Sequence, residues 1–390
     1  MAGRITVLVG TTKGAFLLEG GADRAGWVVR GPFCDGWPIN HVVGDPASGT
    51  LWAGGGGEWQ GAGVWRSEDG GASWTLSKLS NGKFDAWLAN DPGFAAQIGV
   101  EPAPPAPFTG KLDAIWSLAR AGERLYAGGK PGTLHVSADG GTTWESVTAL
   151  TDHPSREGWE PGAAGLVAHS IVVDRANPAK LWVGISAAGV FATEDAGATW
   201  DRRNRMSNSA LAEGQAGHSP AGGGGHDHDV GLCVHNLGRA AGQGDRLYQQ
   251  NHHGVFSSRD GGRSWQDITA GLPSSFGFPI GVHPRDPETV WVLPLNGDTL
   301  GRFPPDASAA VWRTRDGGAS WQDLREGLPQ TACFFTVLRQ AMAVDQCSPA
   351  GVYFGTNSGS VFASRDEGDT WDEIARHLPT VLSVEVLERG

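Results

Sequence analysis

Histidines carry the chemistry that this sequence suggests first. His41, His169 and His235 each open an alternating, strand-like run, and they fall at nearly the same position of a repeat that spans the chain. His252 lies in a nearby Gly-ended loop. Imidazoles that converge from different strands can hold Zn, Cu, Mn or Fe with an open coordination position, so we expect a divalent transition metal on these four histidines. Direct acid–base or substrate-binding roles, and plain hydrogen bonding, are the alternatives.

Carboxylates and tryptophans occupy loops near these histidines. Glu58 and Glu160 are expected to assist catalysis, and His252 is expected to act as a fourth metal ligand or as a general base. Exposed indoles around the mouth of a central channel suit sugar rings or other flat apolar ligands, because the flat apolar face of the indole packs against them. The tryptophans expected to bind substrate are Trp37, Trp59, Trp87 and Trp159, with Trp116 in the same group. Anchoring of the loops is the alternative role for each tryptophan.

A short pattern recurs six times and identifies the elements that must position these side chains. Its form is [S/T]-x-D-x-G-x-[S/T]-W, and its aspartates are Asp69, Asp139, Asp195, Asp260, Asp316 and Asp366. Aspartate accepts hydrogen bonds from turn amides, and glycine supplies a backbone conformation that a side chain would forbid. The tryptophan starts the return strand and packs between sheets. Each copy is therefore expected to be a structural hairpin corner.

Four antiparallel strands, A to D, are predicted for each repeat, with the aspartate turn between C and D. Such repeats predict an all-β fold, a seven-bladed β-propeller, with six or eight blades as the less favoured counts. The first unit, residues 1–32, lacks the aspartate turn and also lacks a strand A. Residues 379–388 would supply this missing strand A. This pairing would close the ring and remove exposed sheet edges. We therefore expect a single propeller domain over residues 1–390.

In such a ring the loops sort into two rims. The D–A and B–C loops share one rim of the central channel, and the aspartate turns lie on the other. The insertions fall on the first rim, together with the candidate residues, and they comprise 81–112, 151–168, 203–230 and 295–310. Irregular loops on a rigid scaffold are where function usually lies. The glycine run within 203–230 suggests a mobile lid.

Bulk composition excludes several classes of partner. A formal net charge of −12 without a long basic run argues against nucleic acid and anionic membranes. No apolar stretch is long enough to span a bilayer, and a strand that begins at Ile5 leaves no room for a signal peptide. The four cysteines show no metal-finger or redox spacing, and Cys233 is expected to be a buried structural thiol. These features indicate a reduced, cytoplasmic protein.

The repeated turn resembles the Asp-box, or BNR, repeat, and the whole chain resembles bacterial BNR-repeat proteins often labelled glycosyl hydrolase or exo-sialidase. The resemblance implies the propeller fold. A true sialidase is disfavoured, because that family uses a tyrosine nucleophile and Tyr126, Tyr248 and Tyr353 all occupy one scaffold position in strand B. Asp-box xyloglucanases place two propellers face to face. Photosystem II assembly factors of this type bind protein, and a propeller lyase of streptogramins uses a histidine and a metal.

These observations together predict a metal-dependent hydrolase or lyase. Its substrate would be a small molecule or carbohydrate bound at the channel rim, and its metal would polarise a substrate oxygen or activate water. The competing hypothesis is a non-catalytic scaffold whose rim loops bind a protein or a glycan.

Overall fold

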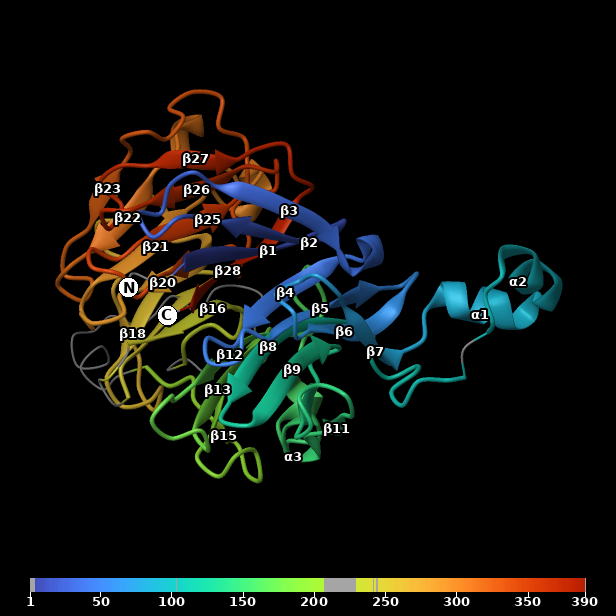
Figure 1. Ribbon diagram of the computed structural model, residues 1–390. Coiled ribbons are helices and arrows are strands. Elements are labelled where there is room, and N and C mark those ends of the chain that lie inside the picture. The colour runs from blue at the N-terminus through green and yellow to red at the C-terminus, as the bar shows by residue number, and fades with distance from the viewer. Residues whose placement is uncertain (1–3, 103, 207–228, 241, 243–244, 390) are drawn as a thin grey trace.

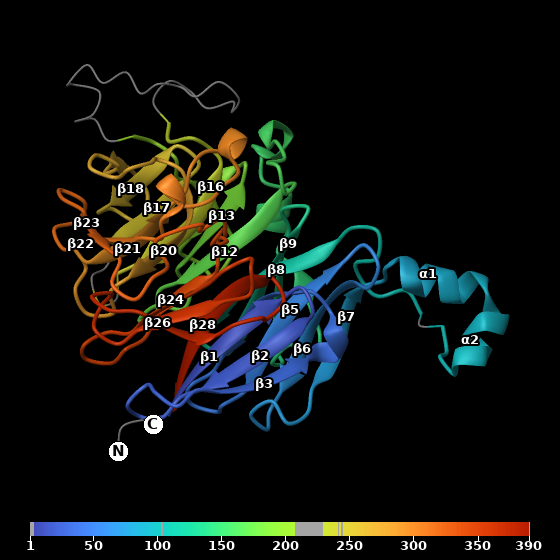
Figure 2. The same cartoon turned by 90° about the horizontal axis from the view of Figure 1, so that it is seen from above.

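The protein forms a closed ring of antiparallel sheets. The computed structural model describes residues 4–102, 104–206, 229–240, 242 and 245–389. Within these residues, seven four-stranded sheets follow one another around a central axis (Figures 1 and 2). The predicted seven-bladed β-propeller is thereby confirmed. Most of the predicted lid, residues 207–228, lies outside the described residues.

Each blade is a meander of four strands. In sheet order, the first three blades are β28 (Val381–Arg389), β1 (Arg4–Thr11), β2 (Gly14–Glu19) and β3 (Val28–Phe33); β4 (Ile39–Gly44), β5 (Leu51–Gly57), β6 (Gly61–Ser67) and β7 (Thr75–Ser80); and β8 (Ala114–Ala121), β9 (Arg124–Lys130), β10 (Leu134–Ser137) and β11 (Glu145–Ser146). Blades 4 and 5 are β12 (Val167–Val173), β13 (Leu181–Ser186), β14 (Gly189–Thr193) and β15 (Asp201–Arg202); and β16 (Val234–Arg239), β17 (Leu247–Asn251), β18 (Gly254–Ser258) and β19 (Gln266–Asp267).

The last two blades complete the ring, and a few short helices lie in the loops. The strands are β20 (Gly277–Val282), β21 (Val290–Pro294), β22 (Val311–Thr314) and β23 (Gln322–Leu324); and β24 (Met342–Val344), β25 (Val352–Gly355), β26 (Val361–Ser364) and β27 (Asp372–Ala375). The helices are α1 (Lys83–Asn90), α2 (Pro92–Ile98), α3 (Thr148–Thr151), η1 (Cys34–Gly36), η2 (Arg156–Gly158), η3 (Asp298–Leu300) and η4 (Pro305–Ala307).

The first blade is built from both ends of the chain. β28 pairs antiparallel with β1 along both strands, with one register shift between Gly10 and Thr11. Val7 and Val9 of β1 and Val384 of β28 are fully buried, so the contact combines a hydrogen-bond ladder with apolar packing. The pairing confirms the predicted closure of the ring and leaves β1 without a free edge.

The six aspartate turns share one hydrogen-bond pattern. At Asp195, Oδ1 accepts from the Thr193 hydroxyl at 2.7 Å and the Thr199 N–H at 2.9 Å, and Oδ2 accepts from the Thr199 hydroxyl at 2.6 Å. The Thr193 hydroxyl accepts from the Gly197 N–H at 2.9 Å. The same four contacts recur at the other five aspartates. These are the contacts of a structural corner.

Aromatic side chains of the second strand tie blades to the turns of their neighbours. In four pairs of adjacent described blades, an indole N–H or a tyrosine hydroxyl donates a hydrogen bond of 2.8 to 3.1 Å to the next blade. The acceptor is the carbonyl oxygen of the residue that follows the turn aspartate. The pairs are Trp52 with Gly140, Tyr126 with Ala196, Trp182 with Gly261 and Trp291 with Glu367. Each ring is buried, and the bond satisfies a donor that burial removes from water. Tyr248 and Tyr353 are likewise buried in second strands.

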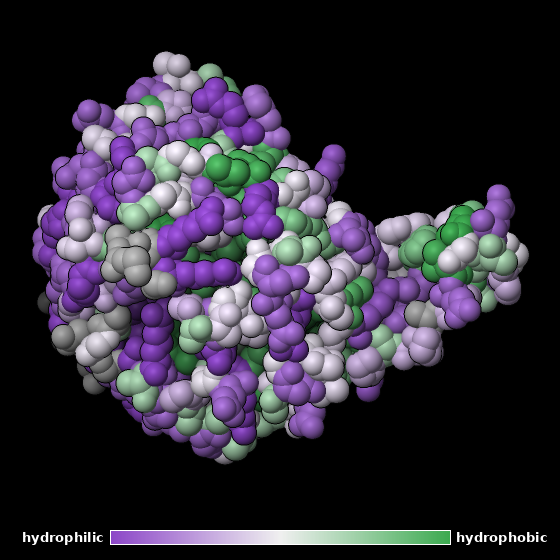
Figure 3. Space-filling view, in the orientation of Figure 1, coloured by the Kyte–Doolittle hydropathy of each residue, from purple (hydrophilic) through white to green (hydrophobic). Residues whose placement is uncertain are grey.

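The two rims of the ring differ, as the sequence predicts. The aspartate turns occupy one rim, and the long connections between blades occupy the other. Residues 81–102 and 104–112 leave this second rim as an arm that carries α1 and α2 (Figures 1 and 2), and part of the arm's surface is apolar (Figure 3). None of the described helices combines the length and the apolar character needed to cross a membrane.

Replacement of Asp316 by asparagine should destabilise the protein more at pH 7 than in acid. Hydrogen bonds from Ser320 and Thr314 lower the pKa of Asp316 to about 2. A carboxyl group with a depressed pKa stabilises the fold above its unfolded value, near 4, and this stabilisation is lost as the pH falls toward 2. We expect calorimetry to give a Tm about 1–2 °C below wild type at pH 7, with a smaller difference at pH 3.

Asp113→Asn, at an exposed position, is the matched control and should leave Tm unchanged at both pH values. An equal loss of Tm at pH 7 and pH 3 in the Asp316 variant would contradict the role of the ionised carboxylate.

Candidate active site and metal centre

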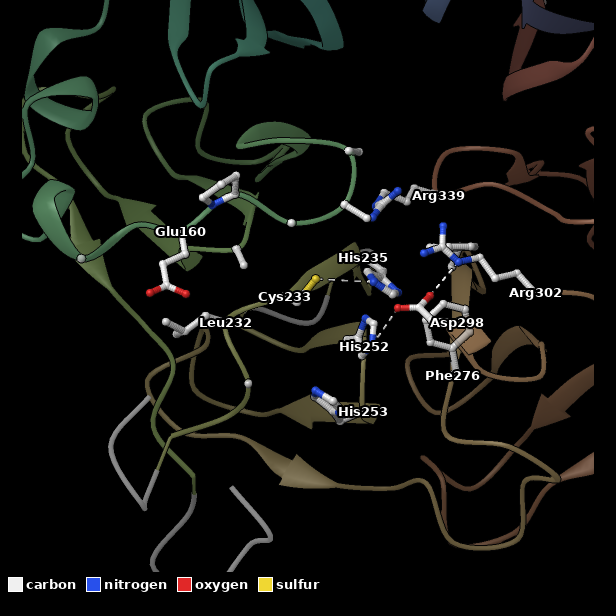
Figure 4. Close-up of a pocket in the computed structure, with 18 residues that line it drawn as sticks. Glu160, Leu232, Cys233, His235, His252, His253, Phe276, Asp298, Arg302 and Arg339 are labelled. Carbon is white, nitrogen blue, oxygen red and sulfur yellow. Dashed lines mark hydrogen bonds and ion pairs between the residues drawn. The ribbon is translucent and has the colours of Figure 1, made fainter. Parts of the chain in front are cut away.

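A cavity of about 340 Å³ opens on the loop rim. Loops that join successive blades and the tips of blades 5 and 6 form its walls (Figure 4). The side chains that define its chemistry are Glu160, Cys233, His235, His252, Asp298, Arg302 and Arg339. The predicted insertions 151–168 and 295–310 both contribute to it, so the cavity lies on the rim that the sequence predicts.

β-Bulges in the innermost strands position two of the predicted histidines. The pairing register skips His169 in β12, His235 in β16 and Trp116 in β8. A skipped residue is left out of the ladder, and the bulge re-aims its side chain. In β4 the skipped residue is Asn40, so His41 lies one position further along its strand.

Three of the skipped residues bridge to the innermost strand of the next blade. Asn40 Nδ2 donates to a carbonyl oxygen of β8 at 2.8 Å, and His169 Nε2 donates to a carbonyl oxygen of β16 at 2.6 Å. His235 Nδ1 donates to a carbonyl oxygen of β20 at 2.6 Å. The position that the repeat alignment identifies, near the start of each innermost strand, therefore carries hydrogen bonds that join three pairs of neighbouring blades.

Cys233, His235 and His252 form the one cluster of three potential metal ligands found among the described residues. Their ligand atoms all lie within 4.8 Å of one another, and Cys233 Sγ is 3.6 Å from His235 Nε2. Zinc bonds of about 2.3 Å to sulfur and about 2.0 Å to nitrogen, at a tetrahedral angle, would place these two atoms about 3.5 Å apart. This pair already has the separation that a zinc ion requires.

Hydrogen bonds orient the two imidazoles of this cluster. A carbonyl oxygen only accepts, so Nδ1 of His235 carries the proton and Nε2 presents a lone pair toward Cys233. His252 Nε2 lies 3.4 Å from Asp298 Oδ2, an outer carboxylate contact typical of metal-binding histidines. Burial lowers the pKa of His252 and lowers that of His235 strongly, so both imidazoles are neutral at pH 7.

Two arginines lie against one aromatic ring of the cavity. The guanidinium carbon atoms of Arg339 and Arg302 are 4.8 and 5.9 Å from the centroid of the Phe278 ring. Arg302 Nε also donates to Asp298 Oδ1 at 2.6 Å. Burial lowers the pKa of Arg339 to about 10, which still leaves the side chain charged at neutral pH. The cavity thus combines neutral imidazoles with two cations.

The structure does not assemble the predicted four-histidine metal site. His169 is completely buried, and both of its ring nitrogens have hydrogen-bond partners. His41 accepts from a backbone N–H of β8 at 2.9 Å and pairs with Glu385 at 3.3 Å. Neither side chain lines the cavity. His235 and His252 therefore stay as candidate ligands, whereas the contacts of His41 and His169 are structural.

The two predicted carboxylates lie in different places. Glu160 lines the cavity, with an exposed side chain on the side away from Asp298 (Figure 4). Glu58 is exposed and pairs with Lys83 at the start of α1, and it does not line the cavity. Of these two predicted carboxylates, Glu160 alone is thus positioned to act on a ligand in this cavity.

The four tryptophans predicted to bind substrate do not line the cavity. Trp59 and Trp87, 50 and 42% exposed, belong to an aromatic cluster with phenylalanines of the arm. Trp159 is buried, and its indole N–H donates to a serine of its own loop at 2.9 Å. Trp37 packs edge-on against a tryptophan of β6. Loop anchoring accounts for Trp37 and Trp159, and phenylalanines supply the aromatic lining.

Sequence reasoning gave Cys233 a structural role rather than that of a ligand, and it assigned no role in the site to Asp298, Arg302 or Arg339. The available signal was the spacing of Cys233 and His235, two positions apart, with Cys233 directly before β16 and His235 in its bulge. Asp298 and Arg302 lie in the irregular insertion 295–310, which has no counterpart in the other repeats. Arg339 lies in a loop that offers no periodic pattern.

The chain shares its fold with known propellers. No protein-family model matches it. The xyloglucanase of Hypocrea jecorina is 22% identical over 251 residues, 64% of this chain and 25% of that protein. The GH74 xyloglucanase from Xanthomonas campestris has a TM-score of 0.60 at 18% identity, covering 95% of this chain and 52% of that chain. YCF48 bound to D1 peptide has a TM-score of 0.51 at 13% identity, covering 86% and 82%.

The extent of these matches limits what they show. The chain spans 25% of the length of the Hypocrea jecorina relative and 52% of the Xanthomonas campestris structure. At such identities the likeness shows the β-propeller fold, and the chemistry must be argued from the cavity itself.

Burial of neutral His169 predicts a loss of stability in weak acid. Burial, with a smaller contribution from Arg339, lowers the pKa of His169 to about 3. Below the unfolded pKa near 6.5, the unfolded chain takes up a proton that the folded chain does not, so this group alone lowers the free energy of unfolding by about 1.4 kcal/mol per pH unit. Urea unfolding of His169→Gln should show about 2 kcal/mol less loss between pH 7 and pH 5 than wild type.

His377→Gln, at an exposed position, provides the control and should keep the wild-type pH profile. Parallel profiles for wild type and His169→Gln would show that His169 is not held neutral by burial.

Proposed function

We propose that the protein is an enzyme that acts on a sugar or small sugar-like substrate in this cavity, with a divalent metal bound by Cys233, His235 and His252. The observation that supports the metal is the convergence of three ligand atoms within 4.8 Å at the cavity wall. One thiolate and two imidazoles suit zinc and leave one tetrahedral position for water or substrate. A thiolate disfavours Mn, which prefers oxygen ligands, so zinc leads among the metals considered.

The other side chains of the cavity divide the remaining tasks. A divalent ion would polarise a substrate oxygen or lower the pKa of a bound water. Asp298 orients His252, and Glu160 supplies a carboxylate for proton transfer. Hydrolysis and elimination both use these parts. New reducing ends without ultraviolet absorbance would identify hydrolysis, and an absorbing unsaturated ring would identify elimination.

Similarity to xyloglucanases supports a carbohydrate as the substrate class. This similarity supports the class of substrate and not a particular polysaccharide, because the chain covers 25% of the Hypocrea jecorina enzyme. A true sialidase stays disfavoured, since Tyr126, Tyr248 and Tyr353 are buried in second strands of their blades.

A non-catalytic propeller that binds protein or glycan is the second candidate. YCF48 shares the fold and was solved bound to D1 peptide. The exposed aromatic cluster around Trp59 and Trp87 favours such a surface on the arm. A scaffold of this kind would not require the cluster of Cys233, His235 and His252, which is the feature that distinguishes the two candidates.

Elemental analysis should find about one zinc per chain in protein purified without a histidine tag. Cys233→Ser and His235→Ala should each lose most of this zinc, because a site with three protein ligands holds the ion poorly with two. The same variants should lose turnover of a carbohydrate substrate.

His169→Gln is the matched control, since it changes a histidine at the equivalent bulge and should keep its zinc. Absence of zinc from wild type after supplementation, or its retention in His235→Ala, would contradict the metal site. Turnover by metal-free protein that is lost on rapid alkylation of Cys233 would instead favour a thiolate nucleophile paired with His235.

A further inference from the structure

The cavity contains one cation, Arg339, that forms no ion pair with a carboxylate among the described residues. Arg302 is paired with Asp298, and the cavity's other carboxylate, Glu160, is exposed on the far side (Figure 4). Within the described part of the chain, Arg339 makes no ion pair with a carboxylate, and its Nε has no hydrogen-bond partner. Withdrawing a charged guanidinium from water without a counter-charge is costly. A ligand could supply the missing negative charge.

Arg339 is held in place by the inner strands. Its carbonyl oxygen accepts a hydrogen bond from Asn236 of β16 at 2.5 Å, and the following residue, Gln340, donates to the His169 carbonyl of β12. The guanidinium lies over the Phe278 ring, which fixes its position further. A charged group held in this way loses little freedom when it binds an anion.

Arg339 and the metal ligand His235 both lie against the Phe278 ring. The His235 ring centroid is 4.7 Å from that of Phe278, and the Arg339 guanidinium is 4.8 Å from it. An anion bound by Arg339 would therefore lie close to His235 and Cys233. Bound zinc with one thiolate would add further positive charge, which also favours an acidic ligand.

We propose that Arg339 binds an oxyanion of the substrate, so that the enzyme acts on acidic sugars rather than neutral ones. The proposal rests on the proposed function for the sugar itself. A guanidinium presents a planar fork of N–H donors that matches a carboxylate or a phosphate with two parallel hydrogen bonds. The shared chemistry is a compact oxyanion, supplied either by a uronic acid or by a sugar phosphate.

Isothermal titration calorimetry of the zinc-supplemented protein would test this with D-glucuronate, D-glucose 6-phosphate and D-glucose. Wild type should bind at least one of the two acids at least about tenfold more tightly than glucose, as expected for charge-assisted hydrogen bonds. Arg339→Gln should weaken binding of that acid about 10- to 100-fold. Arg339→Lys should fall between the two, because it keeps the charge but loses the fork.

Arg175→Gln, in an exposed turn between β12 and β13, is the matched control and should bind as wild type does. Preference for glucuronate would identify a carboxylate, and preference for glucose 6-phosphate a phosphate. Equal affinity of wild type for an acid and for glucose, no binding of either acid, or unchanged affinity in a folded Arg339→Gln variant would overturn the proposal.

Zinc content measured on the same samples separates this proposal from the metal site. Weakened binding of the preferred acid, with zinc retained, is the expected combination in Arg339→Gln. Acid binding that depends on Arg339 in protein without zinc would contradict the metal site alone. Bound zinc without affinity for either acid would contradict the anion site alone.

Discussion

Closure of the ring by β28 is the constraint on which the rest of the structure depends. Because β28 completes the first blade against β1, the innermost strands must meet their neighbours all the way around the axis. Two sets of hydrogen bonds join neighbouring blades. In one set, aromatic side chains of second strands donate to the aspartate turns of the next blade. In the other set, residues at the bulges donate to the innermost strand of the next blade. A ring tied in this way can carry long irregular loops without losing its shape.

The candidate site is built on a strand position that elsewhere in the ring only joins neighbouring blades. His169 and His235 occupy equivalent bulges, and each donates one ring proton to the next blade. The second nitrogen of His169 lies 3.0 Å from a neighbouring serine hydroxyl, whereas that of His235 faces Cys233, with His252 brought beside it by the tip of blade 5. The difference between scaffold and site therefore lies in the loops around an unchanged strand position.

What repeats along the chain could be predicted, and what occurs once could not. The aspartate turns, the alternating strands and the unpaired last strand recur or complement one another, and so they predicted the blade count, the closure and the rim. The repeat alignment also predicted the level of His169 and His235, but it carries no information on which ring nitrogen a neighbouring blade already uses. Asp298 and Arg339 lie in single, irregular loops whose paths depend on tertiary packing.

The most direct test of this account is an anomalous difference map at the zinc absorption edge, from crystals grown with zinc and without a histidine tag. The account predicts one strong peak within about 2.0–2.3 Å of Cys233 Sγ and of one nitrogen each of His235 and His252. A map with no peak in the cavity, or with peaks only at the aspartate turns of the opposite rim, would contradict it.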